Sequence, residues 1–516
     1  MQQSQSKQQV GGILGFIERI GNKIPDITIL FISAFLLVCV VSAVLAQIHF
    51  NYVHPATGRP IEITNMLSGK ALVDLMSKMV TNYANFPPLS MVIVATLGIG
   101  IADGSGYINT GLKKILSITP KVLITPVVIL VGMLSHLGPD SGYVIIIPIA
   151  AYMFYAVGKH PLAGIAASFA GIAGAFAANY TPSAIDPVIQ GFTQSAAQII
   201  DPGYQVNVLC NYFYAFASTF IVIGACWWVT EKITNPWLWK ACPLDDDLDL
   251  GNENNSSITP SENRAFKIAT AVLLLMLTGL AAALYPADSI LRAPDGVIAS
   301  FKAPIMQSIV SLIFIFAALV GLVYGIACGK FKSPKDVTAA MEDITKTLVQ
   351  LIVFYFFAAQ FLYAFGASNM GALIAVSGAE FLKSLNLPPQ VTVFGIIVFV
   401  ALLNLIITSA SAKWAILAPI FVPMLMAVGI APELTQVAFR VSDSAVNVVT
   451  PMFAFYPLII LYCQKYVKNA GIGTLSSMML PYTIALLVSL TFMLYLFWWM
   501  DIPLGFQADY VYPRRF

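Results

Sequence analysis

Charged residues are scarce in this chain and make up only 10% of its 516 residues. A soluble globular protein normally carries about a quarter of its residues as Asp, Glu, Lys or Arg, so this composition excludes a soluble surface. The formal net charge of +2 gives no basis for nucleic-acid binding. Hydrophobic residues make up 58% of the chain, and the mean hydropathy is +0.81. The class that fits is an integral membrane protein embedded in a lipid bilayer.

Motifs of metal binding, redox chemistry and hydrolysis are also missing. The six cysteines show no CxxC or Cys/His spacing, so we interpret them as buried structural thiols. Neither HExxH nor GxSxG occurs, which disfavours an integral-membrane enzyme. A channel would need a filter-like ring, and the paired hairpins predicted from the apolar runs argue against it. A transporter is the remaining membrane class, and it requires no organic cofactor.

The most informative feature that is present is an internal repeat. Residues 143–161 read YVIIIPIAAYMFYAVGKHP, and residues 414–432 read WAILAPIFVPMLMAVGIAP, with 8 of 19 positions identical. The matched residues include two prolines in each copy, which apolar bias does not explain. Further on, the pair Thr181-Pro182 corresponds to Thr450-Pro451. A duplicated membrane unit is typical of a secondary transporter.

Apolar runs predict an all-α integral membrane protein with nine transmembrane helices and two re-entrant hairpins, at 122–158 and 391–429. Most Lys and Arg residues then fall on the cytoplasmic side, as the positive-inside rule requires. The N-terminus is cytoplasmic, the C-terminus is periplasmic, and the hairpins enter from opposite faces as an inverted repeat. Residues 162–200 and 433–463 are predicted to be broken helices. Each is longer than one span, so a double crossing is the alternative.

A polar stretch at 231–264 divides the chain into a first half at 1–230 and a second half at 265–516. It contains DDDLD and GNENNSS, which is typical of a solvated cytoplasmic linker. An acidic surface for a partner is the alternative interpretation. Residues 69–82 are predicted to form an amphipathic surface helix.

The helical pattern breaks at four places inside the predicted membrane region. These are the hairpin tips at 135–142 and 408–413 and the breaks at 179–182 and 447–451. Unwound backbone at membrane depth needs protein or a watery cavity to satisfy it, so the breaks predict a cavity. A Thr followed by Pro suits the N-cap and first position of a helix. Thr181 and Thr450 are therefore predicted to begin half-helices whose positive ends suit an anionic ligand.

Oxygen-bearing side chains at these breaks predict binding of an alkali cation, with Na⁺ favoured over H⁺ as the coupling ion. For any single Ser or Thr, the alternative is a hydrogen bond to its own helix. The predicted cation-binding residues are Ser135, Ser141, Asn179, Asp186, Asn404, Ser409, Asp443 and Asn447.

Few charged residues lie deep in the predicted membrane region, and such residues are functional candidates by default. Arg440 and Asp443 are three residues apart on one helix face, which predicts that they pair with each other. Lys413 is then a free cation that meets a substrate carboxylate or extends to the interface. Trp414 is predicted to stack on a substrate ring or to pack in the hairpin. Asp186 is interpreted as a cation or proton site, or as a residue facing water.

Several motifs in the chain resemble those of a known family, the AbgT family of p-aminobenzoyl-glutamate transporters. The resemblance rests on SASAKWAILAPIFVPM at 409–424, FRVSDS at 439–444, HPLAG at 160–164 and ERIGNKIPD at 18–26. It implies a homodimeric, cation-coupled carrier of the bacterial inner membrane that works by an elevator-like movement. Some members of the family export sulfonamide antimetabolites. The positions that match the family's functional residues are Asp186, Ser411, Trp414, Pro432, Arg440, Asp443 and Pro451, with Asn404 and Asp443 near the cation site.

We therefore expect a secondary transporter of p-aminobenzoyl-glutamate or a similar aryl-amide dicarboxylate, coupled to Na⁺ or H⁺. The alternative within transport is an efflux pump for sulfonamide antimetabolites, since the direction of flux is not encoded in the sequence. The predicted substrate-binding residues are Thr181, Ser411, Lys413, Trp414, Pro432, Arg440, Thr450 and Pro451.

Overall fold

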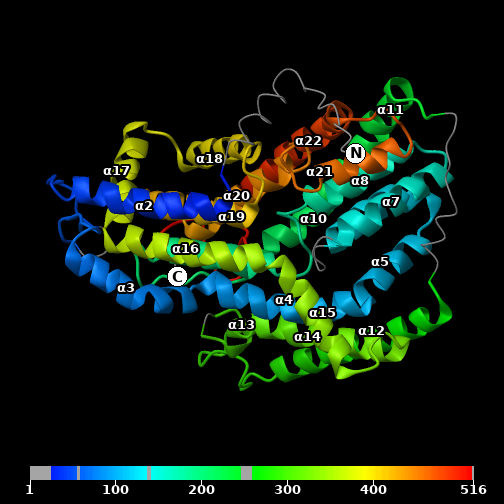
Figure 1. Cartoon of the computed structure of the whole chain (residues 1–516), viewed down its shortest axis with the longest axis horizontal. Helices are drawn as coiled ribbons and strands as arrows, with labels where there is room; N and C mark the ends of the chain where they lie inside the picture. Colours follow the sequence, from blue (N-terminus) through cyan, green and yellow to red (C-terminus); the bar gives the residue numbers. More distant parts are fainter. Residues whose placement is uncertain (1–24, 55–57, 136–140, 246–257, 301, 514–516) are drawn as a thin grey trace, which may run out of the picture.

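The computed structural model describes residues 25–54, 58–135, 141–245, 258–300 and 302–513. The molecule is built from helices (Figure 1), and across those ranges the only β-structure is a pair of isolated bridges. The predicted all-α fold is confirmed. The sequence before residue 25, which contains part of the family motif, lies outside the described residues.

The first half of the chain contains one hairpin and one broken helix. Its hairpin consists of α6 and α7, and its broken helix consists of α8 and α9, with a π-helical turn after α10. The elements are α2 Ile27–Leu45, α3 Gly69–Ala84, α4 Pro87–Ser105, α5 Tyr107–Ser117, η1 Lys121–Leu123, α6 Ile124–Leu134, α7 Ser141–Ala156, α8 Pro161–Ala173, α9 Ile185–Ala197, α10 Tyr212–Val229, η3 Thr230–Thr234 and α11 Asn235–Ala241.

The second half repeats this order, with the hairpin α18–α19 followed by the broken pair α20–α21. The shared order agrees with the repeat seen in the sequence, while the inverted orientation in the membrane stays a prediction. The elements are α12 Pro260–Leu284, α13 Pro304–Gln307, α14 Ile309–Cys328, α15 Pro334–Thr347, α16 Val349–Ala367, α17 Met370–Ser384, α18 Pro389–Asn404, α19 Ala410–Met426, α20 Pro432–Val446, α21 Tyr456–Gln464 and α22 Ile472–Trp499.

Seven helical segments are long and apolar enough to cross a membrane, by length and composition alone. The number rises to eight if α17 and α18, which bend by 117° where they meet, form one broken span. The nine predicted spans are the seven long segments together with the broken helices α8–α9 and α20–α21, each of which would have to cross the membrane. The chain is a multi-pass membrane protein, and the count of nine stays a prediction.

In each hairpin, the residues before the first helix lie close to the residues after the second helix. Lys121 and Val122, before α6, line the same surface crevice as Val157 and Lys159, after α7. In the second hairpin, residues that flank the start of α18 share a crevice with residues that follow α19, namely Asn386, Pro389, Val428 and Ile430. The two ends of each hairpin are therefore neighbours, as a re-entrant hairpin requires, while entry from one membrane face stays a prediction.

The first hairpin packs on α8 through small residues. A Cβ atom on Gly171 of α8 would lie 2.5 Å from the carbonyl oxygen of Ile129 in α6, and one on Gly164 would lie 2.5 Å from the carbonyl oxygen of Ala150 in α7. Contacts this close are possible only without a side chain, and such small-residue packing is common between membrane helices. The hairpin and α8 therefore form a tightly packed unit.

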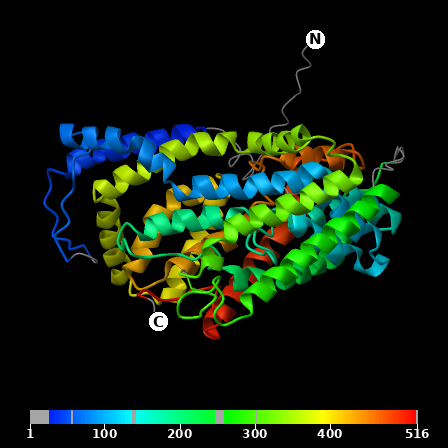
Figure 2. The same ribbon diagram turned by 90° about the horizontal axis from the view of Figure 1, so that it is seen from below.

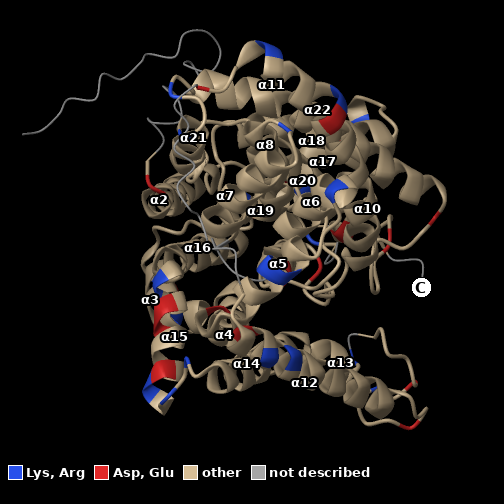
Figure 3. Cartoon of the chain, turned by 90° about the vertical axis from the view of Figure 1, so that its right-hand side faces the viewer, with Lys and Arg blue, Asp and Glu red and all other residues tan. Residues whose placement is uncertain are grey.

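Other helices pack around the two hairpins and the two broken helices. The N-terminal helices α2 and α3 both pack on α16 and lie beside it at one edge of the molecule (Figure 2). Basic residues occur at α5, α11 and α12 (Figure 3), among them Lys113, Lys240 and Lys267. The topology prediction assigns these residues to the cytoplasm.

The structure also differs from the predicted elements. The helices α5, α15 and α17 lie outside the predicted spans, because α5 and α15 are short and carry charges and therefore produce no long apolar run. The polar linker is shorter than the predicted 231–264, since the helix continues through a π-turn to Ala241 and α12 begins at Pro260. Residues 246–257 of this linker are outside the described part of the chain.

Candidate functional site

The first break, residues 175–184 between α8 and α9, is held by two neighbouring helices. The backbone N–H of Ala177 donates to the hydroxyl of Ser444 on α20 at 2.5 Å. The hydroxyl of Tyr212 on α10 donates to the carbonyl of Tyr180 at 2.9 Å. Protein groups thus satisfy unwound backbone at membrane depth, which is the condition for such a break to exist.

The second break, residues 447–455 between α20 and α21, is bound to the second hairpin. The hydroxyl of Thr450 donates to the carbonyl of Leu405 at the hairpin tip at 2.7 Å and accepts a bond from the backbone N–H of Met452 at 3.3 Å. Thr450 is fully buried. The segment that follows α18 and the second break are therefore joined by a buried hydrogen bond.

The prediction that Thr181 and Thr450 begin half-helices is wrong. The helices begin later, α9 at Ile185 and α21 at Tyr456, each beside a second proline, Pro187 or Pro457. The hydroxyl of Thr450 accepts the N–H of Met452, which belongs to the unwound segment and not to the first turn of a helix. The chain thus stays non-helical past both Thr-Pro pairs, and the unwound segments are longer than the sequence suggested.

Arg440 of α20 and Asp186 of α9 form a buried ion pair between the two broken helices. Arg440 Nη1 donates to Asp186 Oδ1 at 2.7 Å, and only 3% of the Arg440 side chain is exposed. Nη2 donates to the carbonyl of Phe176 at 3.2 Å, in the first break. The other Asp186 oxygen accepts bonds from the backbone N–H and hydroxyl of Ser183 at 2.8 and 3.0 Å. Arg440 Nε is buried without a hydrogen-bond partner among the described residues.

Lys413 of α19 pairs with Asp443 of α20 in a second buried ion pair. Lys413 Nζ lies 2.6 Å from Asp443 Oδ1, with 1% and 0% of the two side chains exposed. The ammonium also donates to the side-chain oxygen of Asn404 and to the carbonyl of Ile407, the latter at 3.2 Å. Asn447 donates to Asp443 Oδ2 at 3.0 Å. Four of the predicted site residues are thus in one cluster.

These contacts correct the predicted pairing. Arg440 does not pair with Asp443, and Lys413 is not a free cation. The two charged residues of α20 are three positions apart, but each meets an opposite charge on a different neighbouring element. The spacing of charged residues within one helix could not reveal those partners, because α9 and the second hairpin approach α20 only in the folded chain.

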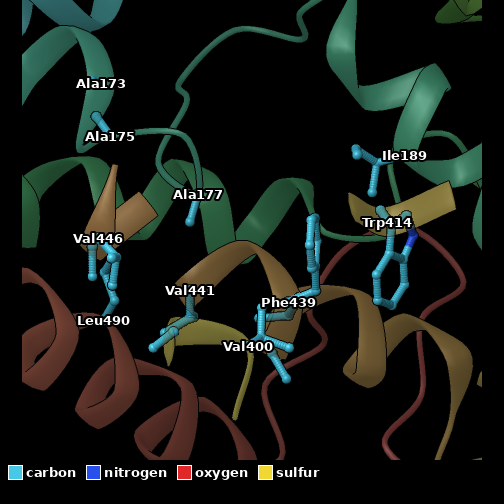
Figure 4. Close-up of a cluster of buried hydrophobic side chains, with 14 of the residues drawn as sticks. Ala173, Ala175, Ala177, Ile189, Val400, Trp414, Phe439, Val441, Val446 and Leu490 are labelled. Carbon is cyan, nitrogen blue, oxygen red and sulfur yellow. The ribbon is translucent and has the colours of Figure 1, made fainter. Parts of the chain in front are cut away.

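Trp414 is packed inside the molecule. Its ring lies beside Phe439 of α20 (Figure 4), with ring centroids 4.5 Å apart and an interplanar angle of 27°. Its indole N–H donates to the hydroxyl of Thr193 on α9 at 2.9 Å, and 1% of the residue is exposed. In this conformation Trp414 joins the second hairpin to both broken helices.

A row of polar residues on α20 was missed by the sequence analysis. Gln436 accepts a bond from Thr193 at 2.6 Å and donates to Asn211 at 2.7 Å, while Glu433 accepts bonds from Tyr204 at 3.0 and 3.2 Å. With Arg440 and Asn447, these residues follow helical spacing along one helix. A polar stripe at that spacing in a membrane protein marks a face turned to the interior, so the signal was present in the sequence.

The remaining predicted residues are more dispersed. The hydroxyl of Ser135 donates to the carbonyl of Gly132 in its own helix at 2.6 Å, and Ser409 caps α19 by accepting the N–H of Ala412 at 3.4 Å. Pro432 is the first residue of α20. Ser411 is buried, and Asn179, Thr181 and Pro451 lie in the breaks. Residues 136–140 and the side chain of Ser141 lie outside the described part of the structure.

Two cavities meet the first break. The smaller has a volume of about 10 Å³, and its lining includes the polar side chains of Asn179, Asp186, Asn211 and Arg440. That space suits about one water molecule. The larger, of about 400 Å³, is almost entirely apolar and lies between α4, α12 and α14. Thr181 lines both cavities. A polar anchor and an apolar chamber of ligand size thus adjoin the same break.

Comparison with known proteins finds similarity along almost the entire chain. The family model described as the AbgT putative transporter family matches residues 12–512. The p-aminobenzoyl-glutamate transport protein of Escherichia coli K12 is 32% identical over 511 residues, covering 99% of this chain and 98% of that protein.

Two solved structures are similar in sequence and fold. The YdaH transporter of Alcanivorax borkumensis, reported to have an unusual topology, is 37% identical with a TM-score of 0.87, covering 93% of this chain and 100% of that one. MtrF of Neisseria gonorrhoeae, described as illuminating a class of antimetabolite efflux pumps, is 39% identical with a TM-score of 0.90, covering 96% of this chain and 100% of that one.

Proposed function

Because this chain belongs to the AbgT family of transporters, we propose that it carries p-aminobenzoyl-glutamate or a similar aryl-amide dicarboxylate by cation-coupled secondary transport. The chain is a transporter rather than an enzyme, since its relatives are transport proteins. The cell context that fits is the bacterial inner membrane, with a homodimeric carrier whose N-terminus is cytoplasmic and whose C-terminus is periplasmic.

The observation that carries the proposal is that Arg440 lines the small cavity at the first break, where Thr181 also borders the apolar cavity. Arg440 Nε is buried without a hydrogen-bond partner among the described residues, which leaves one guanidinium donor for an incoming acceptor. A carboxylate is the acceptor that guanidinium geometry suits best. The adjoining apolar cavity of about 400 Å³ matches an aryl group. An aryl-amide carboxylate has both features in one molecule.

The ion pair between Arg440 and Asp186 suggests how substrate and cation binding are linked. A substrate carboxylate that binds Arg440 competes with Asp186 for the same guanidinium. Asp186 then becomes a buried carboxylate with a weakened partner, which is costly unless another cation neutralises it. A Na⁺ ion or a proton at Asp186 and the nearby oxygens of the first break supplies that charge. Substrate binding therefore favours cation binding at the same break.

The test is flux in proteoliposomes with imposed gradients. Labelled p-aminobenzoyl-glutamate should accumulate against its gradient when an inward Na⁺ gradient is applied at fixed pH. A proton gradient without Na⁺ should give little accumulation. If only the proton gradient drives transport, Asp186 becomes a proton carrier and Na⁺ coupling is wrong. If neither gradient moves this compound, the substrate assignment is wrong.

Efflux of sulfonamide antimetabolites is the second candidate function. Its support is the similarity to MtrF over nearly the whole chain. The apolar cavity of about 400 Å³ also has room for an aryl sulfonamide without a carboxylate. Efflux predicts that expression lowers the cellular concentration of a labelled sulfonamide. Equal concentrations with and without the protein would exclude it.

A further inference from the structure

The ammonium of Lys413 lies where the second half of the chain assembles oxygen atoms suited to a free cation. The carboxylate of Asp443 is 2.6 Å away, and the amide oxygen of Asn404 accepts a bond from the same ammonium. The backbone carbonyl of Ile407 accepts at 3.2 Å. A carboxylate, an amide oxygen and an unwound carbonyl are the ligand types that bind Na⁺ at broken helices in transporters.

The surroundings of the ammonium are also those of a cation site. Asn404 is the last residue of α18, so the ammonium lies at the negative end of that helix. The ring of Phe439 is 5.6 Å from Lys413 Nζ, which allows a cation–π contact. Only 1% of the Lys413 side chain is exposed, so it does not extend to the membrane interface.

The cluster is held from several sides. Asn404 donates to the carbonyl of Asp443 at 2.9 Å and to the side-chain oxygen of Asn447 at 3.1 Å. Asn447 in turn donates to the second oxygen of Asp443 at 3.0 Å. The oxygens of Asp443 and Asn404 are therefore oriented toward Lys413 by other members of the cluster. A site so arranged would hold its cation in a fixed position.

We infer that Lys413 is a built-in cation that takes the place of an exchangeable Na⁺ in the second half of the chain. The inference rests on the proposed cation-coupled transport and refines it. A tethered ammonium neutralises Asp443 throughout the cycle and cannot dissociate with the substrate. The second hairpin tip then stays bound to α20 without an ion from solution. The exchangeable ion belongs to the first half, around Asp186 and Asn179.

The experiment measures Na⁺-specific thermal stabilisation of the purified protein without substrate. The melting temperature is compared in NaCl and in choline chloride at equal ionic strength for wild type and for Lys413→Ala. Removing the ammonium leaves Asp443 unneutralised in an oxygen-lined space. We expect Na⁺ to raise the Tm of Lys413→Ala by roughly 2 °C or more above its effect on wild type. Lys413→Gln serves as a second variant that fills more of the space if the alanine variant does not fold.

Two controls define the site. Lys413→Arg keeps a tethered cation and should respond to Na⁺ as wild type does. The double variant Lys413→Ala with Asp443→Asn removes the carboxylate as well and should lose the additional Na⁺ effect. The same pattern should appear in transport, where Lys413→Ala requires more Na⁺ than wild type.

The inference fails if neither neutral variant gains a Na⁺ effect beyond that of wild type. It also fails if wild type shows a Na⁺ effect that Asp443→Asn removes, because Na⁺ would then bind Asp443 with Lys413 in place. The melting measurement contains no substrate. A Na⁺ gain in Lys413→Ala, together with no transport of p-aminobenzoyl-glutamate by the wild-type protein, would therefore support this inference and contradict only the proposed substrate.

Discussion

Arg440 and Asp186 connect the two broken helices through one ion pair, 2.7 Å long and almost fully buried. The arginine lies on α20 in the second half of the chain, and the aspartate lies on α9 in the first half. The internal repeat thus has a functional consequence, since each half contributes one member of the pair at the first break. Rearrangement of this break must alter the pair.

Removal of Arg440 should destabilise the protein and abolish transport. Arg440→Ala leaves Asp186 buried without its counter-ion, which typically costs about 3 to 5 kcal/mol. The matched control is Lys346→Ala, which breaks the exposed pair with Asp343 and should leave the Tm unchanged. Thermal unfolding in detergent and uptake in proteoliposomes check both variants. Equal Tm values for the two would contradict a structural role of the buried pair.

Neutralising the partner of Arg440 should uncouple substrate binding from the cation. In Asp186→Asn, a substrate carboxylate no longer displaces a charged competitor, so it needs no cation to compensate. We expect the apparent affinity for p-aminobenzoyl-glutamate to become independent of Na⁺, whereas wild type should bind more tightly as Na⁺ rises. Equilibrium binding across a series of Na⁺ concentrations measures this. An unchanged Na⁺ dependence in the variant would rule out Asp186 as the coupling residue.

The hairpins and the helix breaks could be predicted from the sequence because their signals are local. Pro and polar residues inside apolar runs indicate the helix breaks. The matched motifs at 143–161 and 414–432 indicate the hairpins. Both hairpins and both breaks are present in the structure. The bounds of the broken helices agree within a few residues, because His160 and Ala431 stand directly before prolines that begin helices.

The partners within the site could not be predicted, because they depend on the packing of distant segments. Asp186 and Arg440 are 254 positions apart, and their contact depends on how α9 lies against α20. The spacing of Arg440 and Asp443 predicted that they pair with each other, whereas in the fold Arg440 pairs with Asp186 and Asp443 pairs with Lys413. The Thr-Pro pairs misled for a similar reason, since a hairpin carbonyl binds Thr450 and the helix begins only at Tyr456.

Close packing of the first hairpin predicts a contrast between two glycines. Gly171→Ala places a methyl group 2.5 Å from the carbonyl oxygen of Ile129, and the overpacking should cost about 1 to 3 kcal/mol. Gly224→Ala on α10 meets nothing within 4 Å and should leave stability unchanged or slightly raised. Comparison of Tm values decides the point. A Gly171→Ala protein as stable as wild type would show that α6 moves freely relative to α8.

The inverted topology predicts that the mouths of the two hairpins face opposite sides of the membrane. Lys121→Cys marks the first and Asn386→Cys marks the second, in a background with Cys242 and Cys328, the two partly exposed cysteines among the described residues, replaced by Ser. In intact spheroplasts a membrane-impermeant maleimide should label position 386 only. Position 121 should react after the membrane is opened. Labelling of both positions in intact spheroplasts would contradict the inverted repeat.

The most direct test of the account is equilibrium binding of p-aminobenzoyl-glutamate to a protein whose apolar cavity is filled. Ala317 of α14 lines that cavity, so Ala317→Phe should occupy the space assigned to the aryl group. Ala282→Phe, on an exposed position of α12, is the control. The account predicts saturable binding to wild type and to the control, and at least about tenfold weaker binding to Ala317→Phe, equivalent to 1.4 kcal/mol. Equal affinity in all three proteins would contradict the placement of the aryl group in the apolar cavity.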